Sequence, residues 1–194
     1  IRPRDWSSDV CSSDLTLLAP LPRERTKRIV YIGTPEIAVR PLRALVAHGF
    51  DVCLVITGHD KRRGRGGATS PNSVKEAAID LGIPVSHDIA DVLKLNPEGL
   101  LGVVVAFGRL ISTEILQHVP MINIHYSALP RWRGAAPVER AILSGDKNTA
   151  VCIIQVVEQL DAGDVLASAP CVIDENDTVT GLRNRLGELA LPLL

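Results

Sequence analysis

Short apolar runs alternate with helix-like segments along this chain from Lys27 onward. Each run has the length of a buried strand, and each intervening segment carries the apolar spacing or the capping residues of a helix. Parallel strands need crossover connections that pack against the sheet, so this alternation favours a mostly parallel sheet. We therefore predict an α/β, Rossmann-like fold with helices on both faces of the sheet.

Turn and capping residues give the expected element boundaries. Thr34 is suited to cap a helix that begins at Pro35, and Gly49 is suited to end that helix. The run at 100–107 is apolar throughout, as expected for a central strand covered on both faces. The predicted strands are 28–33, 51–57, 83–86, 100–107, 121–125, 149–157 and 164–173, and the predicted helices are 35–48, 73–82, 112–119, 137–146 and a last one from Asp177.

The first 26 residues differ from the rest of the chain. "SSDV" and "SSDL" repeat around Cys11, and Ser and Asp dominate without any usable period. This composition is typical of a disordered or non-native tail. We expect one folded domain, residues 27–194.

Composition limits the classes of function. The chain has 194 residues, of which 46% are hydrophobic and 22% charged, which suits a globular core. Its formal net charge is -1, so any contact with nucleic acid must come from a local basic patch. We also expect a monomer.

The cysteines and the hydropathy bear on the compartment. None of the four cysteines forms a C-x-x-C pair, and most lie in apolar runs, which favours buried thiols and a reducing environment. No apolar run approaches the ~20 residues that a membrane-spanning helix needs. We expect a cytoplasmic protein with no membrane partner.

The motifs of common cofactor sites are missing. "IGTPEIA" follows the first strand but lacks the G-x-G-x-x-G spacing, and the chain contains no phosphate-binding G-x-x-x-x-G-K-[ST] loop. No cluster of His, Cys and carboxylate residues has metal-ligand spacing. We therefore expect neither a nucleotide cofactor nor a metal.

Polar residues close the strand "MINIH". Side chains alternate along a strand, so Asn123 and His125 share one face. Ligands of parallel α/β sheets bind at the carboxyl ends of the strands, which is where this pair lies. The pair is either part of a solvated face or part of a catalytic site.

The position of Asp161 favours the catalytic site over the solvated strand face. By itself, "LDAGD" is an ordinary Asp- and Gly-containing turn. Its loop leaves the predicted strand 149–157, however, and that strand can lie beside the strand of Asn123 and His125. An amide, an imidazole and a carboxylate at one sheet edge suit attack of an amine on a carbonyl group, with donors for the oxyanion and an acceptor for the proton.

Several motifs, in order, resemble the amino-terminal catalytic domain of the methionyl-tRNA formyltransferases, within the wider formyltransferase superfamily. They are "IGTP", "DKRRGRGG" followed by "SP" and "VK", "VVVAFG", "INIH" followed by "SALPRWRGAAP", and "LDAGD". The resemblance implies the formyltransferase fold and 10-formyltetrahydrofolate as co-substrate. It implies that Asn123, His125 and Asp161 are the catalytic residues.

The resemblance also assigns the loop after His125. It implies that Ser127, Ala128, Leu129 and Pro130 lie against the folate. Tyr126 stands where many members of the family carry Gly or another small residue. Its ring either reshapes the mouth of the folate pocket or packs outward.

Basic residues gather in the Gly-rich loop 60–67. A charge run of this kind is usually a solvated face, but the interleaved glycines would let it mould to a nucleic-acid backbone. The resemblance implies contact with the tRNA, with Arg65 as the functional arginine and Lys61, Arg62 and Arg63 beside it. Arg131 and Arg133 either line the tRNA path or form surface salt bridges, and Trp132 is expected to anchor packing.

The function implied is transfer of the formyl group to the amino group of initiator methionyl-tRNA for translation initiation. The family has a further carboxy-terminal domain that helps to hold tRNA, and the chain stops at Leu194 without it. Two alternatives remain open. One is formyl transfer to a sugar amine or to glycinamide ribonucleotide, and the other is a non-catalytic folate- or RNA-binding module.

Overall fold

A computed structural model describes residues 18–22, 26–62 and 69–194. Its strands are β1 (Arg28–Gly33), β2 (Asp51–Ile56), β3 (Lys61–Arg62), β4 (Thr69–Ser70), β5 (Val85–Ser86), β6 (Leu100–Val105), β7 (Met121–His125), β8 (Asn148–Gln155) and β9 (Val165–Val172). Its α-helices are α1 (Val39–Ala47), α2 (Ser73–Asp80), α3 (Thr113–His118), α4 (Pro137–Leu143) and α5 (Val179–Ala190), with 3-10 helices η2 (Glu36–Ala38), η3 (Ile89–Lys94) and η4 (Leu191–Leu193).

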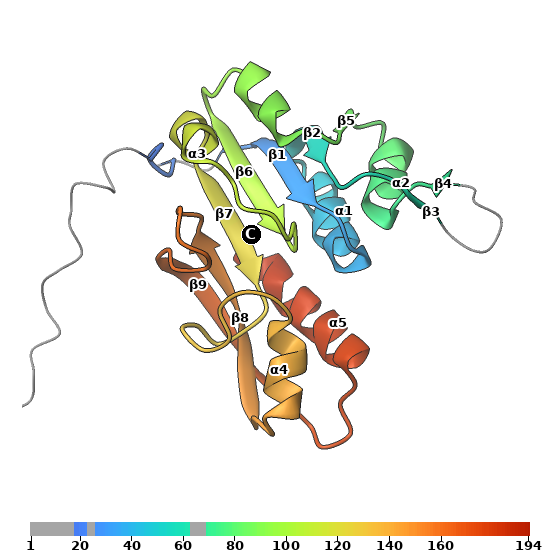
Figure 1. Cartoon of the computed structure of the whole chain (residues 1–194), viewed down its shortest axis with the longest axis vertical. Coiled ribbons are helices and arrows are strands. Elements are labelled where there is room, and N and C mark those ends of the chain that lie inside the picture. Colours follow the sequence, from blue (N-terminus) through green and yellow to red (C-terminus); the bar gives the residue numbers. More distant parts are fainter. Residues whose placement is uncertain (1–17, 23–25, 63–68) are drawn as a thin grey trace, which may run out of the picture.

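A seven-stranded sheet forms the centre of the molecule, in the order β5-β2-β1-β6-β7-β8-β9 (Figure 1). The first five strands in this order, β5, β2, β1, β6 and β7, pair in parallel. Strand β8 runs antiparallel to β7, and β9 runs antiparallel to β8. The predicted mostly parallel α/β sheet is confirmed. The two antiparallel strands at one side bring the chain back beside β7 without a helical crossover.

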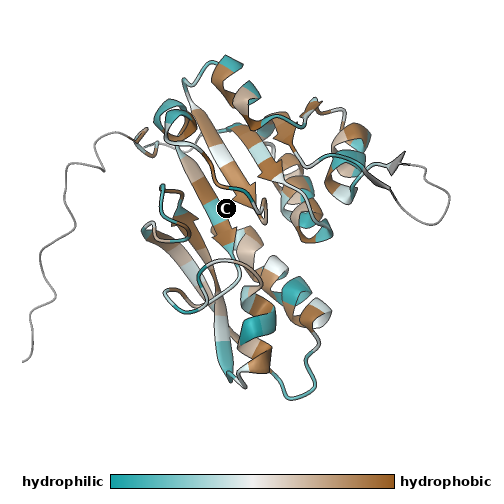
Figure 2. Cartoon of the chain, in the orientation of Figure 1, coloured by the Kyte–Doolittle hydropathy of each residue, from teal (hydrophilic) through white to brown (hydrophobic). Residues whose placement is uncertain are grey.

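Helices cover both faces of the sheet, as predicted. One face carries α1, α2, α4 and α5, whose buried side chains form one core cluster with residues such as Tyr31, Ile124 and Ile153. The other face carries η3 and α3, which pack on Val30, Ile32 and their neighbours. The central strands are accordingly apolar along most of their length (Figure 2).

The start of the first helix differs from the prediction. Thr34 does not cap it, because the chain first makes the 3-10 turn η2 with Pro35 as its N-cap, and α1 begins only at Val39. The Thr34 hydroxyl oxygen instead accepts a hydrogen bond from the Gly58 backbone N–H at 3.0 Å. Thr34 therefore joins the ends of β1 and β2.

Part of the segment predicted as a tail packs on the domain. The backbone N–H of Ala19 donates to the carbonyl oxygen of Leu116 at 2.9 Å, and Leu18 packs against the cluster beneath α3. Residues 1–17 and 23–25 lie outside the described residues. The nature of that part of the segment stays a prediction.

Candidate active site

Asn123 and His125 lie on β7, between β6 and the antiparallel β8. In the ladder, Asn123 stands opposite Val104 on one side and Ile154 on the other, and His125 stands opposite Cys152. Strand alternation puts both side chains on one face of the sheet. His125 is buried and Asn123 is half-buried, so the pair does not belong to a solvated strand face.

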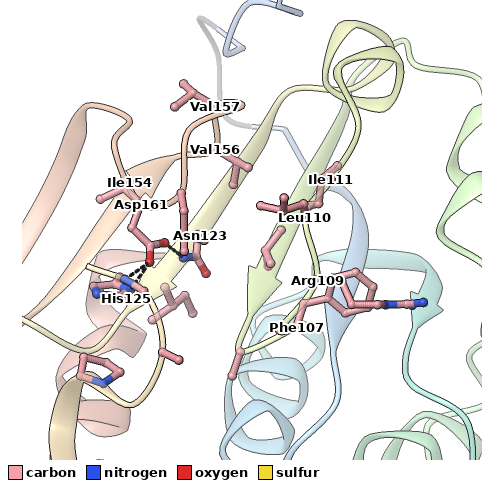
Figure 3. Close-up of a pocket in the computed structure, with 18 of the residues that line it drawn as sticks. Phe107, Arg109, Leu110, Ile111, Asn123, His125, Ile154, Val156, Val157 and Asp161 are labelled. Carbon is pink, nitrogen blue, oxygen red and sulfur yellow. Dashed lines mark hydrogen bonds and ion pairs between the residues drawn. The ribbon is translucent and has the colours of Figure 1, made fainter. Parts of the chain in front are cut away.

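Asp161 reaches this pair by an indirect route. Because β8 is antiparallel, it ends at Gln155 opposite Ile122, near the beginning of β7. The following loop 156–164 folds back along the sheet, so that the Asn123 side-chain amide donates to Asp161 Oδ1 at 3.1 Å. Asp161 Oδ2 lies 3.5 Å from His125 Nδ1 (Figure 3). The expected meeting of the three side chains is therefore observed.

Backbone groups of one neighbouring segment complete the hydrogen bonding. The N–H of Gly134 donates to Asp161 Oδ2 at 2.8 Å, and His125 Nε2 lies 3.0 Å from the carbonyl oxygen of Trp132. A carbonyl oxygen can only accept, so Nε2 carries a proton in this arrangement. His125 Nδ1 is left facing Asp161 at a distance longer than a hydrogen bond.

A pocket of about 470 Å³ opens over these side chains. Its walls come from the end of β6 and the loop after it, the end of β7, the segment before α4, and the loop after β8, and they are mostly apolar (Figure 3). The lining residues are Val104, Ala106, Phe107, Gly108, Arg109, Leu110, Ile111, Asn123, Ile124, His125, Tyr126, Gly134, Ala135, Ala136, Pro137, Ile154, Gln155, Val156, Val157, Glu158, Leu160 and Asp161. Apolar walls with a few convergent polar groups are the usual make-up of a small-molecule site.

The loop assigned to folate lies beside this pocket, and none of its four residues lines it. The Ser127 hydroxyl is buried and donates to the Arg131 carbonyl oxygen at 2.6 Å. Ala128 and Leu129 pack on a small cluster of β8 side chains that includes Cys152, and Pro130 follows them. In this structure the loop packs on β8 beside the site, and its contact with folate stays a prediction.

Tyr126 does not pack outward. Its side chain is 5% exposed and joins Ile122 and Ile124 in the core cluster on the α1 side of the sheet, and part of the residue borders the pocket. Burial raises the pKa of Tyr126 above its ordinary range. The neutral aromatic ring is therefore part of the core beneath the sheet edge that carries the pocket.

The basic loop begins at the carboxyl end of β2, the sheet edge toward which β1, β6 and β7 also run. Lys61 and Arg62 form β3, which pairs with β4 in a two-stranded ribbon. Arg63 and Arg65 lie outside the described residues.

Arg131 makes an ion pair with Asp146 at 2.7 Å, and the Trp132 ring packs on the core cluster as expected.

Three stretches of the pocket wall were not assigned from the sequence. They are 106–111, after β6, 134–137, before α4, and 154–158 with Leu160, at the end of β8 and in the loop after it. Ala106, Gly108, Gly134 and Ala136 all have positive φ, so the backbone turns sharply around the pocket there. The small residues in "VVVAFG" and "RGAAP" are the sequence signal for these turns, and as family motifs they did not by themselves indicate a pocket wall.

The described residues hold neither a metal-ligand cluster nor a membrane-spanning helix. In the described part of the chain, no group of three or more His, Cys, Asp or Glu side chains could hold a metal ion. No helix within residues 18–22, 26–62 and 69–194 has both the length and the apolar character to cross a membrane.

The geometry is that of an α/β enzyme domain with its ligand pocket at the carboxyl ends of parallel strands. Comparison with known families makes this class specific. Residues 27–194 match the formyl transferase family, and the chain belongs to that family. The family resemblance seen in the sequence motifs is confirmed.

Curated relatives carry a more specific name. The chain is 44% identical over 174 residues to the methionyl-tRNA formyltransferase of Heliobacterium modesticaldum, covering 86% of this chain and 55% of that protein. It is 43% identical over 178 residues to the methionyl-tRNA formyltransferase of Methylococcus capsulatus, covering 86% of this chain and 57% of that protein. The chain thus spans about half the length of these relatives.

Solved structures share the fold. Phosphoribosylglycinamide formyltransferase from Bacillus halodurans superposes with a TM-score of 0.69 at 24% identity, over 86% of this chain and 91% of that one. The sugar 3N-formyl transferase WlaRD, crystallised with dTDP and 5-N-formyl-THF, gives a TM-score of 0.68 at 20% identity, over 88% of this chain and 61% of that one. At 24% and 20% identity, these similarities show that the chain shares the fold of these proteins.

Proposed function

We propose that this chain is the catalytic domain of an enzyme that transfers the formyl group of 10-formyltetrahydrofolate to the amino group of initiator methionyl-tRNA. The observation that carries the proposal is the meeting of Asn123, Asp161 and His125 on the wall of the apolar pocket, where Asn123 donates a hydrogen bond to Asp161 and His125 Nδ1 lies 3.5 Å from the same carboxylate. The names of the curated relatives supply the acceptor. We further propose that it acts as a monomer in the cytoplasm, where translation supplies its tRNA.

The pocket suits the folate. A pterin ring is flat and largely apolar on its faces, and the walls at 106–111 and 155–158 offer apolar side chains on either side of Asn123, His125 and Asp161. With the ring between these walls, the formyl group would lie near Asn123 and His125. Formyltetrahydrofolate supplies the formyl carbon on which the reaction takes place.

Asn123 and His125 would stabilise the charge that develops on the formyl oxygen. The amide of Asn123 has two N–H groups and gives one to Asp161, which leaves the other for the substrate. With Nε2–H donated to the Trp132 carbonyl oxygen, the imidazolium form of His125 carries a second N–H at Nδ1, which is not hydrogen-bonded to Asp161 and would be donated to the same formyl oxygen. Fixed donors in a buried site are worth more than the same donors in water.

Asp161 would organise this pair and accept a proton. As the amine attacks, the new N–C bond forms and the bond from the formyl carbon to the folate nitrogen breaks. The amine must lose a proton, and a carboxylate within reach of the site, directly or through a water molecule, can take it. The folate nitrogen receives a proton in turn, so the overall transfer is balanced.

The basic loop would hold the acceptor. Lys61, Arg62, Arg63 and Arg65 carry four positive charges in five positions, on a loop that leaves the same sheet edge as the pocket. Lysine and arginine side chains at such a place attract the phosphates of a tRNA acceptor arm. A small acceptor such as glycinamide ribonucleotide would have less use for a long basic loop.

The test compares acceptors on one preparation of the chain. Methionyl-tRNA, glycinamide ribonucleotide and a nucleotide-linked amino sugar are each incubated with 10-formyltetrahydrofolate, and binding of a folate analogue is titrated in parallel. We expect folate binding, and formyl transfer only to methionyl-tRNA, at a rate that His125→Ala lowers by about 10²–10³-fold. Transfer to a small acceptor would reassign the substrate, and folate binding without transfer to any acceptor would favour a binding module.

A further inference from the structure

One short segment, Arg131–Gly134, contacts two of the three proposed catalytic residues through its backbone. The carbonyl oxygen of Trp132 lies 3.0 Å from His125 Nε2. Two residues later, the N–H of Gly134 donates to Asp161 Oδ2 at 2.8 Å. The orientation of His125 and Asp161 therefore depends on where this backbone lies.

The segment is held from its other side by Asp146. Asp146 Oδ2 accepts from the Trp132 indole N–H at 2.7 Å and from Arg131 Nε at 2.8 Å, and Asp146 Oδ1 accepts from Arg131 Nη2 at 2.7 Å. The Arg131 guanidinium also stacks on the Trp132 ring, 4.3 Å from its centroid. One carboxylate thus fixes two consecutive side chains of the segment.

Trp132 needs such support because of its backbone. Its φ is 62°, in the left-handed region that bulky residues seldom adopt. A conformation of this kind persists only where surrounding contacts determine it. The indole hydrogen bond and the Arg131 pair are contacts that do so on the side-chain side, and Arg140 Nη2 also donates to the Trp132 carbonyl oxygen, at 3.2 Å.

The end of α4 determines where Asp146 lies. Gly145 has a φ of 69°, and its N–H donates to the Ile142 carbonyl oxygen at 3.0 Å. The N–H of Asp146 then donates to the Ala141 carbonyl oxygen, also at 3.0 Å. This helix termination fixes the backbone of Asp146, and with it the position of the carboxylate that binds Arg131 and Trp132.

We propose that Asp146 and Trp132 are positioning residues of the active site, which hold the Trp132 carbonyl against His125 Nε2. The inference rests on the proposed function for its catalytic meaning. With Nε2–H donated to this carbonyl, the ring is held in one orientation with Nδ1 toward Asp161 and the pocket. Without it, the imidazole can rotate or change tautomer, and the oxyanion donor is lost from its place.

The first experiment uses two variants, one that removes only the Asp146–Trp132 hydrogen bond and one that removes all the hydrogen bonds of the Asp146 carboxylate. Trp132→Phe deletes the indole N–H and keeps a ring, and Asp146→Ala deletes the carboxylate. We expect each to lower the turnover of formyl transfer about 10–100-fold while the dissociation constant for a folate analogue changes less than about twofold. Asp177→Asn is the matched control, because Asp177 also holds an arginine, Arg185, through two hydrogen bonds of 3.0 and 2.5 Å, away from the pocket.

The second readout follows the ring itself. In ¹⁵N-histidine NMR spectra of the chain, His125 should show a protonated Nε2 in the wild type and in Asp177→Asn. In Trp132→Phe and Asp146→Ala we expect this signal to shift or broaden. The signal is assigned by its loss in His125→Ala.

These outcomes separate the positioning role from the proposed function. Wild-type turnover and an unchanged His125 signal in folded Trp132→Phe and Asp146→Ala would overturn the positioning role. If Asp146→Ala does not fold, Trp132→Phe alone decides, since it removes the indole N–H from a partly exposed ring and leaves a smaller aromatic ring in its place. If His125→Ala itself keeps full turnover, the proposed function fails, and the NMR result still decides whether Asp146 and Trp132 orient the ring.

Discussion

A β-carbon placed on Gly163 would lie 1.9 Å from the carbonyl oxygen of Gln155. Gly163 belongs to the loop that carries Asp161, and Gln155 is the last residue of β8. Only a glycine lets the two backbones approach so closely, and this approach lets the loop turn back toward Asn123.

Gly163→Ala should therefore displace the loop. We expect a loss of about 1–3 kcal/mol in the free energy of unfolding, as for other overpacked sites, and a larger loss of formyl transfer than of stability. Chemical denaturation and a turnover assay on the same preparation check this. Gly187→Ala is the control, because a β-carbon there meets no atom within 4 Å. Equal turnover in the two variants would show that the position of the loop does not matter.

Asp161→Asn should lose most of its turnover although the side chain keeps its shape. Asp161 accepts from two donors, the Asn123 amide and the Gly134 N–H, one at each oxygen. An asparagine offers one oxygen and one NH₂ group, so one of these donors would face another donor. We expect turnover to fall by about 10²-fold or more, with folate binding nearly retained. Turnover within a few fold of the wild type would remove Asp161 from the reaction.

Asn123→Ala and His125→Ala test the other two members. Each removes one proposed donor to the formyl oxygen, and each should cost about 10²–10³-fold in turnover. Folate binding, measured by titration with an analogue, should change little. Near-normal turnover in either variant would show that the assignment of that residue is wrong.

Loss of the hydroxyl group should change the free energy of unfolding differently at two buried tyrosines, Tyr31 and Tyr126. The Tyr31 hydroxyl donates to the Ala38 carbonyl oxygen at 2.5 Å, whereas the buried Tyr126 hydroxyl has no hydrogen-bond partner among the described residues. Tyr31→Phe should lower the free energy of unfolding by about 1 kcal/mol. Tyr126→Phe should be neutral or stabilising by a similar amount, since it removes an unsatisfied polar group. Urea denaturation of both variants decides, and a clear destabilisation by Tyr126→Phe would indicate a partner for its hydroxyl.

The carboxylate of Asp146 should give stability a specific dependence on pH. Hydrogen bonds from Arg131 and Trp132 lower the pKa of Asp146 from its ordinary 3.8 to about 2. A carboxyl group with a lowered folded-state pKa stabilises the protein above its unfolded pKa, and that contribution is lost as the pH falls through the folded value. The difference in melting temperature between wild type and Asp146→Asn should therefore be full above about pH 5 and shrink between about pH 4 and pH 2. A difference that stays constant across that range would contradict the lowered pKa.

Arg65→Ala should weaken tRNA binding and leave folate binding intact. Each phosphate contact contributes about one unit to the slope of log affinity against log salt, so the slope should become shallower by about that amount. Binding of methionyl-tRNA measured at several salt concentrations gives the slope. Arg43→Ala is a useful control, because Arg43 pairs with Asp80 between α1 and α2. An unchanged slope in Arg65→Ala would place Arg65 outside the tRNA path.

Local pattern alone predicted much of this protein. The alternation of apolar runs and helical segments predicted the α/β sheet, and the two-residue period of "MINIH" predicted that Asn123 and His125 share a face. The motif order predicted the family. These features depend on neighbours along the chain, which is why they can be read without coordinates.

The tertiary structure decided the rest of the site. The sequence allowed strand 149–157 to lie beside β7, and only the fold revealed that it runs antiparallel and that Asp161 must return along the sheet to reach Asn123. Likewise, the motif around Ser127 pointed to a folate contact, while the observed pocket wall runs through Phe107 and Val156. Strand direction and the partner of a carbonyl such as that of Trp132 depend on packing between residues far apart in the chain, and no local period encodes them.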